Sequence, residues 1–267
     1  MHIIVLIKQV PEMDKVLFDS EKGRIDRKSA GVEVNPFDLN ALETAVGIKE
    51  KIGAEISVLS MGPPRAEEAL KEAVARGADN AYLLSDQKFA GADTIATSAS
   101  LAAAVETIGD YDLIIAGEMS VDGDTAQVGP QTAEFLNINH AAYVSELISV
   151  EENQIEIKTS LWQANYSKKF TYPLLITVTK DINTPRLPSF KDKMKARKAE
   201  VNSLTFEDIK NKLKIDEVGF KGSPTWVDNI VVPEEISRKT KVFNEEDKAS
   251  AYKKIKELLI EKNLMED

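Results

Sequence analysis

The sequence predicts an α/β fold: a doubly wound, mostly parallel sheet with an antiparallel extension and a C-terminal arm that ends in a helix. Two observations support this prediction. Short, continuous apolar runs, typical of strands buried on both faces of a parallel sheet, occur at residues 3–7, 56–60, 81–84 and 113–116. Helical patterns alternate with them at residues 38–52, 65–76, 92–108 and 125–136, which indicates helices packed on both faces of one sheet.

The first two helices carry start and stop signals. Asn35 can cap the first, Pro36 suits its first position, and Asp38 is favoured at the positive end of a helix. The second helix follows the MGPP sequence at residues 61–64 and is expected to end at Gly77, a residue typical of C-caps.

Beyond about residue 141 the pattern changes. Residues 144–150, 155–161 and 169–179 are expected to be strands that extend the sheet through antiparallel pairs. A final helix is expected over residues 244–264, with an apolar stripe that would pack on another subunit. We therefore expect a body at residues 1–185, a basic segment at 186–198 and a C-terminal arm at 199–267.

Composition excludes several classes of protein. The 267 residues suffice for one large domain or one domain plus an arm. The chain has no cysteine, and His2 and His140 are its two histidines, so we expect no disulfide, thiolate nucleophile or metal site. The N-terminus lacks a signal-peptide pattern, and no apolar run approaches the roughly 20 residues of a membrane helix. We therefore expect a cytoplasmic protein that does not insert into membranes.

Charge is distributed unevenly along the chain. Residues 1–185 carry 28 acidic and 16 basic residues, a net charge of −12, whereas residues 186–198 carry a net charge of +5. The acidic body argues against nucleic-acid binding. The basic segment suits an acidic protein partner, and a solvated linker is the alternative interpretation.

A candidate ligand-binding segment occupies residues 117–132, between the fourth strand and the next helix. Ligands bind α/β sheets at this edge, small residues admit phosphate groups, and free amides at a helix start attract anions. Asp124 can cap the helix with Gln127 in a capping box, while Asp122 is expected to face a ribose hydroxyl. Residues 34–38 should lie at the same edge. The alternative interpretation is that residues 117–132 form a capped turn and residues 34–38 form a plain helix cap, with no ligand bound at either segment.

Dinucleotide, Walker, serine-elbow and kinase motifs are absent from the sequence. The motifs that are present occur in a characteristic order: IVLIKQV at residues 4–10, VNPFD at 34–38, MGP at 61–63, RGAD at 76–79, the segment 117–132, PLLIT at 173–177, PR at 185–186 and MKARK at 194–198. Together they resemble the β subunit of electron transfer flavoproteins over essentially the whole chain. Residues 161–172 depart from the family, which usually has an acidic Asp/Gly turn there.

The resemblance implies an adenine-nucleotide-binding, Rossmann-like body that forms a heterodimer with a larger α subunit, around which the C-terminal arm wraps. Simple members hold AMP in the β subunit, whereas electron-bifurcating members hold a second FAD there, reduced by NADH. The small residues Gly123 and Thr125 resemble the bifurcating type, because the simple type has bulkier, acidic residues at these positions. The family's nucleotide contacts fall on Leu6, Asn35, Pro36, Phe37, Asp38, Met61, Gly117, Glu118, Met119, Ser120, Val121, Asp122, Gly123, Asp124, Thr125, Ala126, Gln127 and Val128.

The bifurcating type implies that FAD in the β subunit takes a hydride from NADH. One electron then goes to ferredoxin or flavodoxin, and the other passes through the FAD of the α subunit to an acyl-CoA dehydrogenase or enoyl-CoA reductase. A quinone-linked acceptor is a further alternative. We expect no catalytic acid, base or nucleophile in this chain, because the cofactor does the redox chemistry.

The resemblance also gives the basic segment a role, because the family docks its dehydrogenase through the loop before MKAK, around an apolar anchor that is usually leucine. In this chain Phe190 stands at the anchor position, surrounded by Lys191, Lys193, Lys195 and Arg197. An aromatic anchor within a charged rim is typical of a binding hot spot. Two other functions remain open at this stage: a non-bifurcating subunit that holds AMP, and a stand-alone nucleotide-binding regulator, which would need neither arm nor basic loop.

Overall fold

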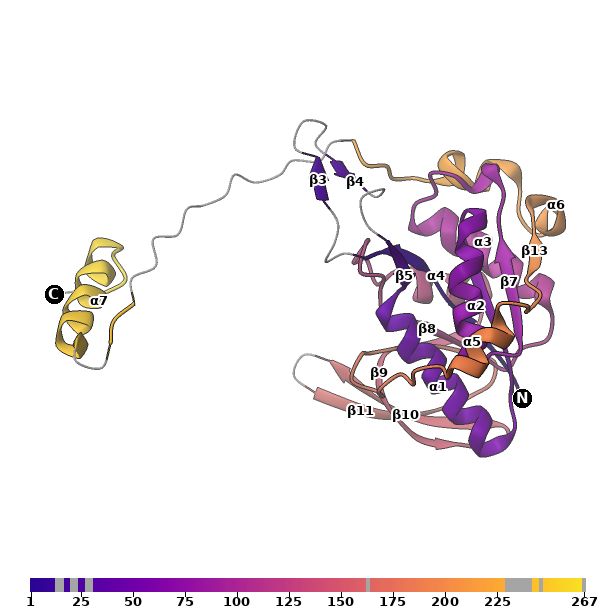
Figure 1. Ribbon diagram of the computed structural model, residues 1–267, viewed down its shortest axis with the longest axis horizontal. Helices are drawn as coiled ribbons and strands as arrows, with labels where there is room; N and C mark the ends of the chain where they lie inside the picture. The colour runs from indigo at the N-terminus through magenta and orange to yellow at the C-terminus, as the bar shows by residue number, and fades with distance from the viewer. Residues whose placement is uncertain are drawn as a thin grey trace. The chain divides into compact units, whose positions relative to one another are not determined.

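A nine-stranded sheet forms the centre of the first of two compact units, residues 1–230 and 231–267, which are described separately (Figure 1). The computed structural model describes residues 1–12, 17–19, 24–26, 31–161, 164–228, 242–244 and 247–265. The strand order is β11-β10-β9-β12-β8-β1-β6-β7-β13. The strands are β1 (His2–Leu6), β6 (Glu55–Met61), β7 (Asn80–Leu84), β8 (Leu113–Gly117), β9 (Asn139–Val150), β10 (Gln154–Leu161), β11 (Ala164–Thr171), β12 (Leu174–Val178) and β13 (Asn202–Leu204).

All neighbours from β9 to β13 in this order pair in parallel. Two short antiparallel pairs lie outside the sheet: β2 (Gln9–Pro11) with β5 (Val32–Val34), and β3 (Leu17–Asp19) with β4 (Arg24–Asp26). The helices of this unit are α1 (Pro36–Ile52), α2 (Glu67–Ala75), α3 (Thr94–Ile108), α4 (Val128–Phe135), α5 (Phe190–Ala196) and α6 (Phe206–Ile209), with short 3-10 turns at Pro64–Ala66, Gln87–Phe89, Ile215–Glu217 and Gly219–Gly222.

Side chains of β1 alternate between two hydrophobic clusters, one on each face of the sheet. Ile3 and Val5 pack with apolar residues of α1 and α2. Ile4 and Leu6 pack with apolar residues of α3 and α4. Because successive side chains of a strand point to opposite faces, this division places helices on both faces. The predicted doubly wound α/β class is therefore confirmed.

The antiparallel extension is also confirmed, since β10 pairs antiparallel with both β9 and β11. The prediction of one strand over residues 169–179 is wrong. Two strands, β11 and β12, lie on either side of Pro173, and β12 pairs in parallel with β8 and β9 in the middle of the sheet. Proline has no amide hydrogen for a strand ladder, and the chain leaves the sheet edge there.

The second unit contains α7 (Lys248–Glu261), which is shorter at both ends than the helix predicted over 244–264. No residue of α7 is buried, and Tyr252, Ile255 and Leu258 on its apolar stripe are exposed. Among the described residues, no helix combines the length and the apolar character needed to cross a bilayer.

Candidate nucleotide-binding site

Three segments meet at the carboxyl edge of the sheet: the second residue after β1 (Lys8), the residue that ends β8 (Gly117), and the first turn of α1. The carboxylate of Asp38 joins them. Its Oδ2 accepts a hydrogen bond from the Lys8 amide at 2.8 Å, and its Oδ1 accepts one from the Gly117 amide at 3.3 Å. Asp38 is 6% exposed, so it is a buried clamp between two strand ends.

Burial changes the acidity of this clamp. Removal from water disfavours a charged carboxylate, and it raises the pKa of Asp38 from 3.8 to about 7. The hydrogen bonds from Asn35, Lys8 and Gly117 and the charge of Lys8 act in the opposite direction but do not outweigh burial. Asp38 therefore changes charge close to neutral pH.

Asn35 links α1 to the loop after β8. Its Nδ2 donates to the Met119 carbonyl at 2.9 Å, and its Oδ1 accepts from the Val121 amide at 3.1 Å. Asn35 takes the N-cap position of α1, as predicted, but its side chain makes no capping bond, because the buried amide is used in these bonds instead. Pro36 does occupy the first turn as predicted. This link brings residues 34–38 and the segment 117–132 into one site.

The loop between β8 and α4, residues 118–127, folds on itself through a tight turn. The Ser120 carbonyl accepts from the amides of Gly123 and Asp124 at 3.2 and 2.8 Å. Asp124 and Ala126 adopt φ values of 50° and 52°, which are uncommon for residues with a side chain. Gly123, Asp124 and Thr125 are exposed. The loop therefore offers its backbone to solvent at the sheet edge.

The predicted capping box of Asp124 and Gln127 is wrong. The helix begins at Val128, four residues after Asp124, and no side chain caps it. A cap requires extended backbone directly before the helix, whereas Asp124 is left-handed and too early. Gln127 instead accepts a hydrogen bond at its Oε1 from the Thr94 hydroxyl at 3.0 Å, which ties the start of α4 to the start of α3.

Lys8 is a site residue that sequence reasoning missed. Its Nζ lies 2.6 Å from Asp122 Oδ1 and 3.2 Å from Ser120 Oγ. Asp122 thus pairs with Lys8, and its position facing a ribose hydroxyl stays a prediction. A lysine two residues after a buried strand, at the edge where ligands bind, was the available signal.

Gly117 stands where no other residue fits. A Cβ built on it would lie 2.5 Å from Asp38 Oδ1 and 2.6 Å from Phe37 Cβ. Such distances are far shorter than an ordinary contact between heavy atoms. The absence of a side chain at Gly117 therefore lets the end of β8 approach the first turn of α1 closely enough for the Asp38 clamp.

The remaining predicted residues divide into two groups. Leu6, Met61 and Val128 belong to the hydrophobic cluster that contains α3 and α4, with Leu6 buried and the other two partly buried. Phe37 and Glu118 are partly exposed, and Pro36 is exposed. Burial, with a smaller effect of the Asp181 charge, raises the pKa of Glu118 above its ordinary value. Within the described residues, no group of three or more His, Asp or Glu could hold a metal ion.

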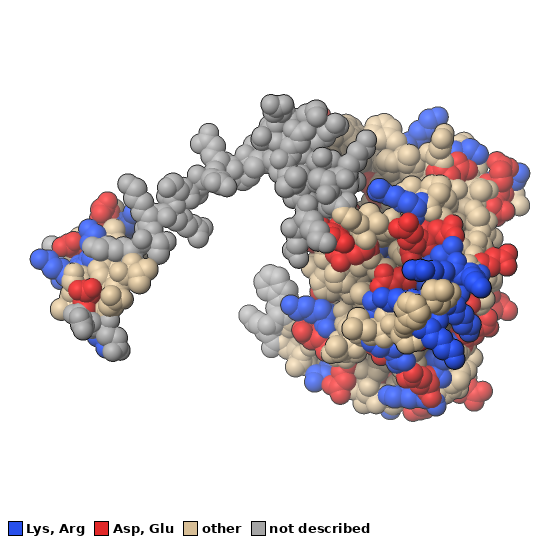
Figure 2. All heavy atoms as spheres, in the orientation of Figure 1, with Lys and Arg blue, Asp and Glu red and all other residues tan. Residues whose placement is uncertain are grey.

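The basic segment forms a separate surface. Helix α5 begins after Ser189, whose hydroxyl accepts from the Asp192 amide. Phe190 is 80% exposed and Met194 41% exposed on this helix. The basic residues around them are also exposed: Lys191, Lys193, Lys195 and Arg197. Figure 2 shows lysine and arginine side chains gathered over this part of the surface.

The fold and the site define a class of protein: a doubly wound α/β chain whose candidate ligand loops lie at the carboxyl edge of its parallel strands. The family described as Electron transfer flavoprotein domain matches residues 22–209. The chain belongs to the electron transfer flavoprotein family, as a β subunit.

Three relatives show the extent of the similarity. Electron transfer flavoprotein subunit beta of Thermoanaerobacterium thermosaccharolyticum is 44% identical over 228 residues, which cover 85% of this chain and 86% of the relative. Caffeyl-CoA reductase-Etf complex subunit CarD of Acetobacterium woodii is 41% identical, with the same coverage of 85% and 86%. Protein FixA of Azorhizobium caulinodans is 35% identical over 273 residues, which cover 100% of this chain and 97% of the relative.

Proposed function

We propose that this chain is the β subunit of an electron-bifurcating flavoprotein, a heterodimer with an α subunit, and that it binds FAD at the edge formed by β1, β8 and α1. FAD bound there would take a hydride from NADH and supply one electron to ferredoxin or flavodoxin and one, through the FAD of the α subunit, to an acyl-CoA dehydrogenase or enoyl-CoA reductase. The protein itself would bind and orient the cofactor and dock the partners.

The observation that carries the proposal is the loop of residues 118–127. Gly123, Thr125 and Ala126 are small, and the first two are exposed. Phosphate groups can approach a backbone closely where side chains are small. Bulkier acidic residues at Gly123 and Thr125 would occupy this space and repel a pyrophosphate. The loop therefore fits a dinucleotide better than a mononucleotide alone.

The surrounding residues would have distinct roles in holding FAD. Leu6, Met61 and Val128 supply apolar surface, because they belong to one cluster at the ends of β1, β6 and the start of α4. Asn35 and Asp38 hold the loop and strand ends in place through hydrogen bonds. The other proposed contacts come from the first turn of α1, the end of β8 and the loop itself: Pro36, Phe37, Gly117, Glu118, Met119, Ser120, Val121, Asp122, Gly123, Asp124, Thr125, Ala126 and Gln127.

Partner docking would use the surface on α5. Phe190 presents most of its ring to solvent, and four cations lie within the same short segment. An exposed aromatic side chain within a charged rim suits a partner with an apolar pocket and acidic surroundings. The C-terminal arm, residues 199–267, would pack on the α subunit through the exposed apolar stripe of α7.

Two relatives bear on this proposal, one through its name and one through the extent of the match. CarD is named as a subunit of a caffeyl-CoA reductase-Etf complex, which joins an electron transfer flavoprotein to a reductase of an acyl-CoA substrate. FixA is a relative that this chain matches over its whole length. The same class of partner, an acyl-CoA dehydrogenase or enoyl-CoA reductase, is what we propose for this chain.

The deciding experiment is a count of bound nucleotides. The chain would be co-expressed with its α subunit, the complex denatured, and the released FAD and AMP quantified per heterodimer by chromatography. We expect two FAD and no AMP. One FAD with one AMP would contradict bifurcation and leave a subunit that holds AMP in a one-path carrier, and a chain that purifies alone without flavin would indicate a stand-alone regulator.

Two variants sharpen the count. Gly123→Asp adds a carboxylate to the exposed loop, and we expect it to reduce the FAD content from two to one, because the FAD of the α subunit remains. Asn153→Asp adds the same charge at an exposed turn between β9 and β10 and should leave the count at two. Equal FAD content in the two variants would show that the loop of residues 118–127 does not belong to the FAD site.

A further inference from the structure

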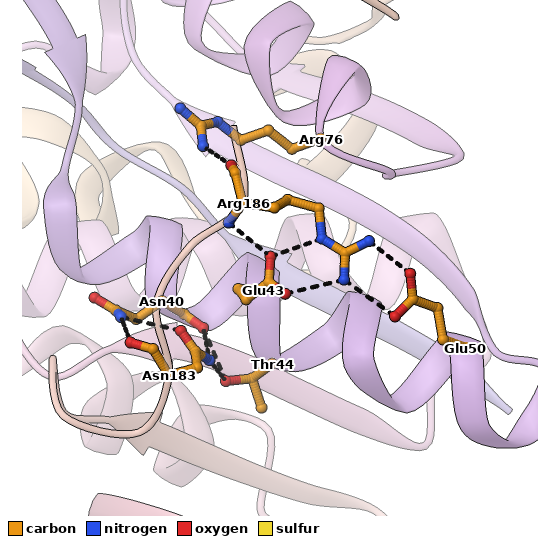
Figure 3. A network of polar contacts seen from close by, with 7 residues as sticks. All are labelled: Asn40, Glu43, Thr44, Glu50, Arg76, Asn183 and Arg186. Carbon is orange, nitrogen blue, oxygen red and sulfur yellow. Dashed lines mark hydrogen bonds and ion pairs between the residues drawn. The ribbon is translucent and has the colours of Figure 1, made fainter. Parts of the chain in front are cut away.

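Arg186 lies at the start of the basic segment, yet its charge is neutralised by two glutamates of this chain (Figure 3). Its Nε and Nη2 donate to the two carboxylate oxygens of Glu43 at 2.8 and 2.9 Å. Its Nη1 and Nη2 donate to the two oxygens of Glu50 at 2.5 and 3.1 Å. Two forked pairs of this kind fix both the position and the plane of a guanidinium group.

The backbone around Arg186 is held as well. Its amide donates to Glu43 Oε2 at 3.0 Å, and its carbonyl accepts from Nη1 of Arg76, at the end of α2. Three residues earlier, the side chain of Asn183 donates to the Asn40 carbonyl at 3.0 Å and to the Thr44 hydroxyl at 2.8 Å. The chain that leads into α5 is therefore fastened to α1 and α2 at successive points (Figure 3).

The electrostatics agree with this geometry. Glu43 has 16% of its side chain exposed and Arg186 has 37%. Hydrogen bonds from Arg186 lower the pKa of Glu50, and the bonds to both glutamates raise the pKa of Arg186 above its ordinary value. Because two carboxylates surround one guanidinium group, Arg186 contributes no net positive charge to the docking surface.

Helix α1 contacts both the candidate cofactor site and the Arg186 network. Asn35 and Asp38 hold the candidate cofactor site at its start, and Glu43 and Glu50 hold Arg186 further along the same 17-residue helix. The docking helix α5 has only 7 residues. Isolated helices of this length are unstable in water, so α5 depends on such attachments for its place and shape.

We propose that Arg186 is a positioning residue: by bridging Glu43 and Glu50 it fixes the start of the docking segment on α1, so that Phe190 is presented at a constant place relative to the cofactor site. The inference rests on the proposed docking function of α5 but concerns a different group. Arg186 acts on the partner through α5 and does not itself pair with an acidic partner.

Substitutions by neutral residues distinguish a positioning role of Arg186 from a role as a docking cation, because the two roles predict different effects of Glu43→Gln on partner binding. Arg186→Gln removes a cation, and Glu43→Gln removes an anion from the same network. If Arg186 were a docking cation, Glu43→Gln would remove one of its two carboxylate partners and leave binding to an acidic partner unchanged or tighter. If Arg186 is a positioning residue, both variants release α5 and both weaken docking. Arg186→Lys keeps the charge without the fork and should recover docking only in part.

The test uses the full heterodimer and two readouts. Hydrogen exchange of the amides of residues 191–197 should become at least 5-fold faster in Arg186→Gln and Glu43→Gln, because a released helix opens more often. It should stay unchanged in the control Lys168→Gln, which removes an exposed cation from β11. The Kd for a purified acyl-CoA dehydrogenase should rise about 5- to 30-fold in the first two variants, with FAD content unchanged, as a smaller fraction of the chain presents α5 correctly.

The two readouts keep the proposals apart. Unchanged exchange in Arg186→Gln, or binding by Glu43→Gln as tight as that of the wild type, would overturn the positioning role. If Phe190→Ala leaves dehydrogenase binding unchanged, the docking function of α5 fails instead, and the exchange rates still decide whether Arg186 holds the segment.

Discussion

Replacement of Asp38 by asparagine tests the central geometry of the candidate site. The two oxygens of Asp38 accept separate hydrogen bonds from the amides of Lys8 and Gly117, at 2.8 and 3.3 Å. Asparagine has one acceptor oxygen, so its NH₂ group would face one of these amides. An unpaired buried donor costs about 1–3 kcal/mol. We therefore expect Asp38→Asn to lower the free energy of unfolding by an amount in this range at neutral pH.

The pH dependence of the free energy of unfolding gives a second, quantitative test of Asp38. Asp38 has a pKa raised from 3.8 to about 7, so the folded chain binds the proton more tightly than the unfolded chain. The stability from this group is complete below the unfolded pKa and is lost as the pH rises through the folded pKa. Between pH 5.5 and pH 8 the wild type should lose about 2 kcal/mol through this group. Asparagine does not titrate, so the variant should lose nothing from this position.

Urea unfolding followed by circular dichroism measures this difference, with the free energy extrapolated to water at each pH. The range starts at pH 5.5 because the isoelectric point is about 5.0. Asp208→Asn is the control, since a hydrogen bond from Thr205 lowers the pKa of the Asp208 carboxyl and keeps it ionised throughout. The difference in free energy of unfolding between Asp208→Asn and the wild type should be constant with pH. Parallel curves for wild type and Asp38→Asn would refute the raised pKa, and a wild type that gains stability with pH would show an ionised, stabilising carboxylate.

Three further substitutions test the loop of residues 118–127. Gly117→Ala should destabilise the chain by about 1–3 kcal/mol in urea unfolding, because its Cβ would lie 2.5 Å from an oxygen of Asp38; unchanged stability would contradict the close approach. Asn35→Ala removes both bonds to the loop and should speed limited proteolysis within it, whereas equal cleavage would show a loop held by other contacts. Asp122→Asn alters a proposed FAD contact that is paired with Lys8, and it should weaken FAD binding a few-fold in titrations; equal or tighter binding would remove Asp122 from the cofactor site.

Local patterns predicted the fold because each strand or helix that defines it can be recognised from a short stretch of sequence. The apolar runs that became β1, β6, β7 and β8 need no knowledge of their partners, since a strand buried on both faces is apolar throughout. Pro36 predicted the start of α1 for a similar reason, as its fixed φ and missing amide suit the first turn. The same reasoning failed at residues 169–179, where one continuous β pattern concealed two strands in different parts of the sheet.

The site was less predictable because its bonds join distant residues. The type of residue at position 35 and its place before a helix predict a cap, but its amide bonds lie 84 and 86 positions further along the chain. Lys8 and Asp122 are 114 positions apart. Local preference is a weak determinant when a buried polar group has a tertiary partner within reach. The sequence could identify the segments that meet at the sheet edge, but not which of their side chains bond to one another.

The loop of residues 118–127 and the docking segment that contains α5 share one source of order. The loop of residues 118–127 has no regular structure, and the docking segment contains only a 7-residue helix, so neither can hold a fixed shape through its own backbone bonds. Each is instead attached by side chains to α1: the loop through Asn35, and the docking segment through Glu43 and Glu50. A site is held more accurately by a packed helix than by loops. Helix α1 is anchored on the sheet by buried apolar residues along its length. It can therefore hold the candidate cofactor site and the docking surface at fixed positions, whatever the sequence of the loops themselves.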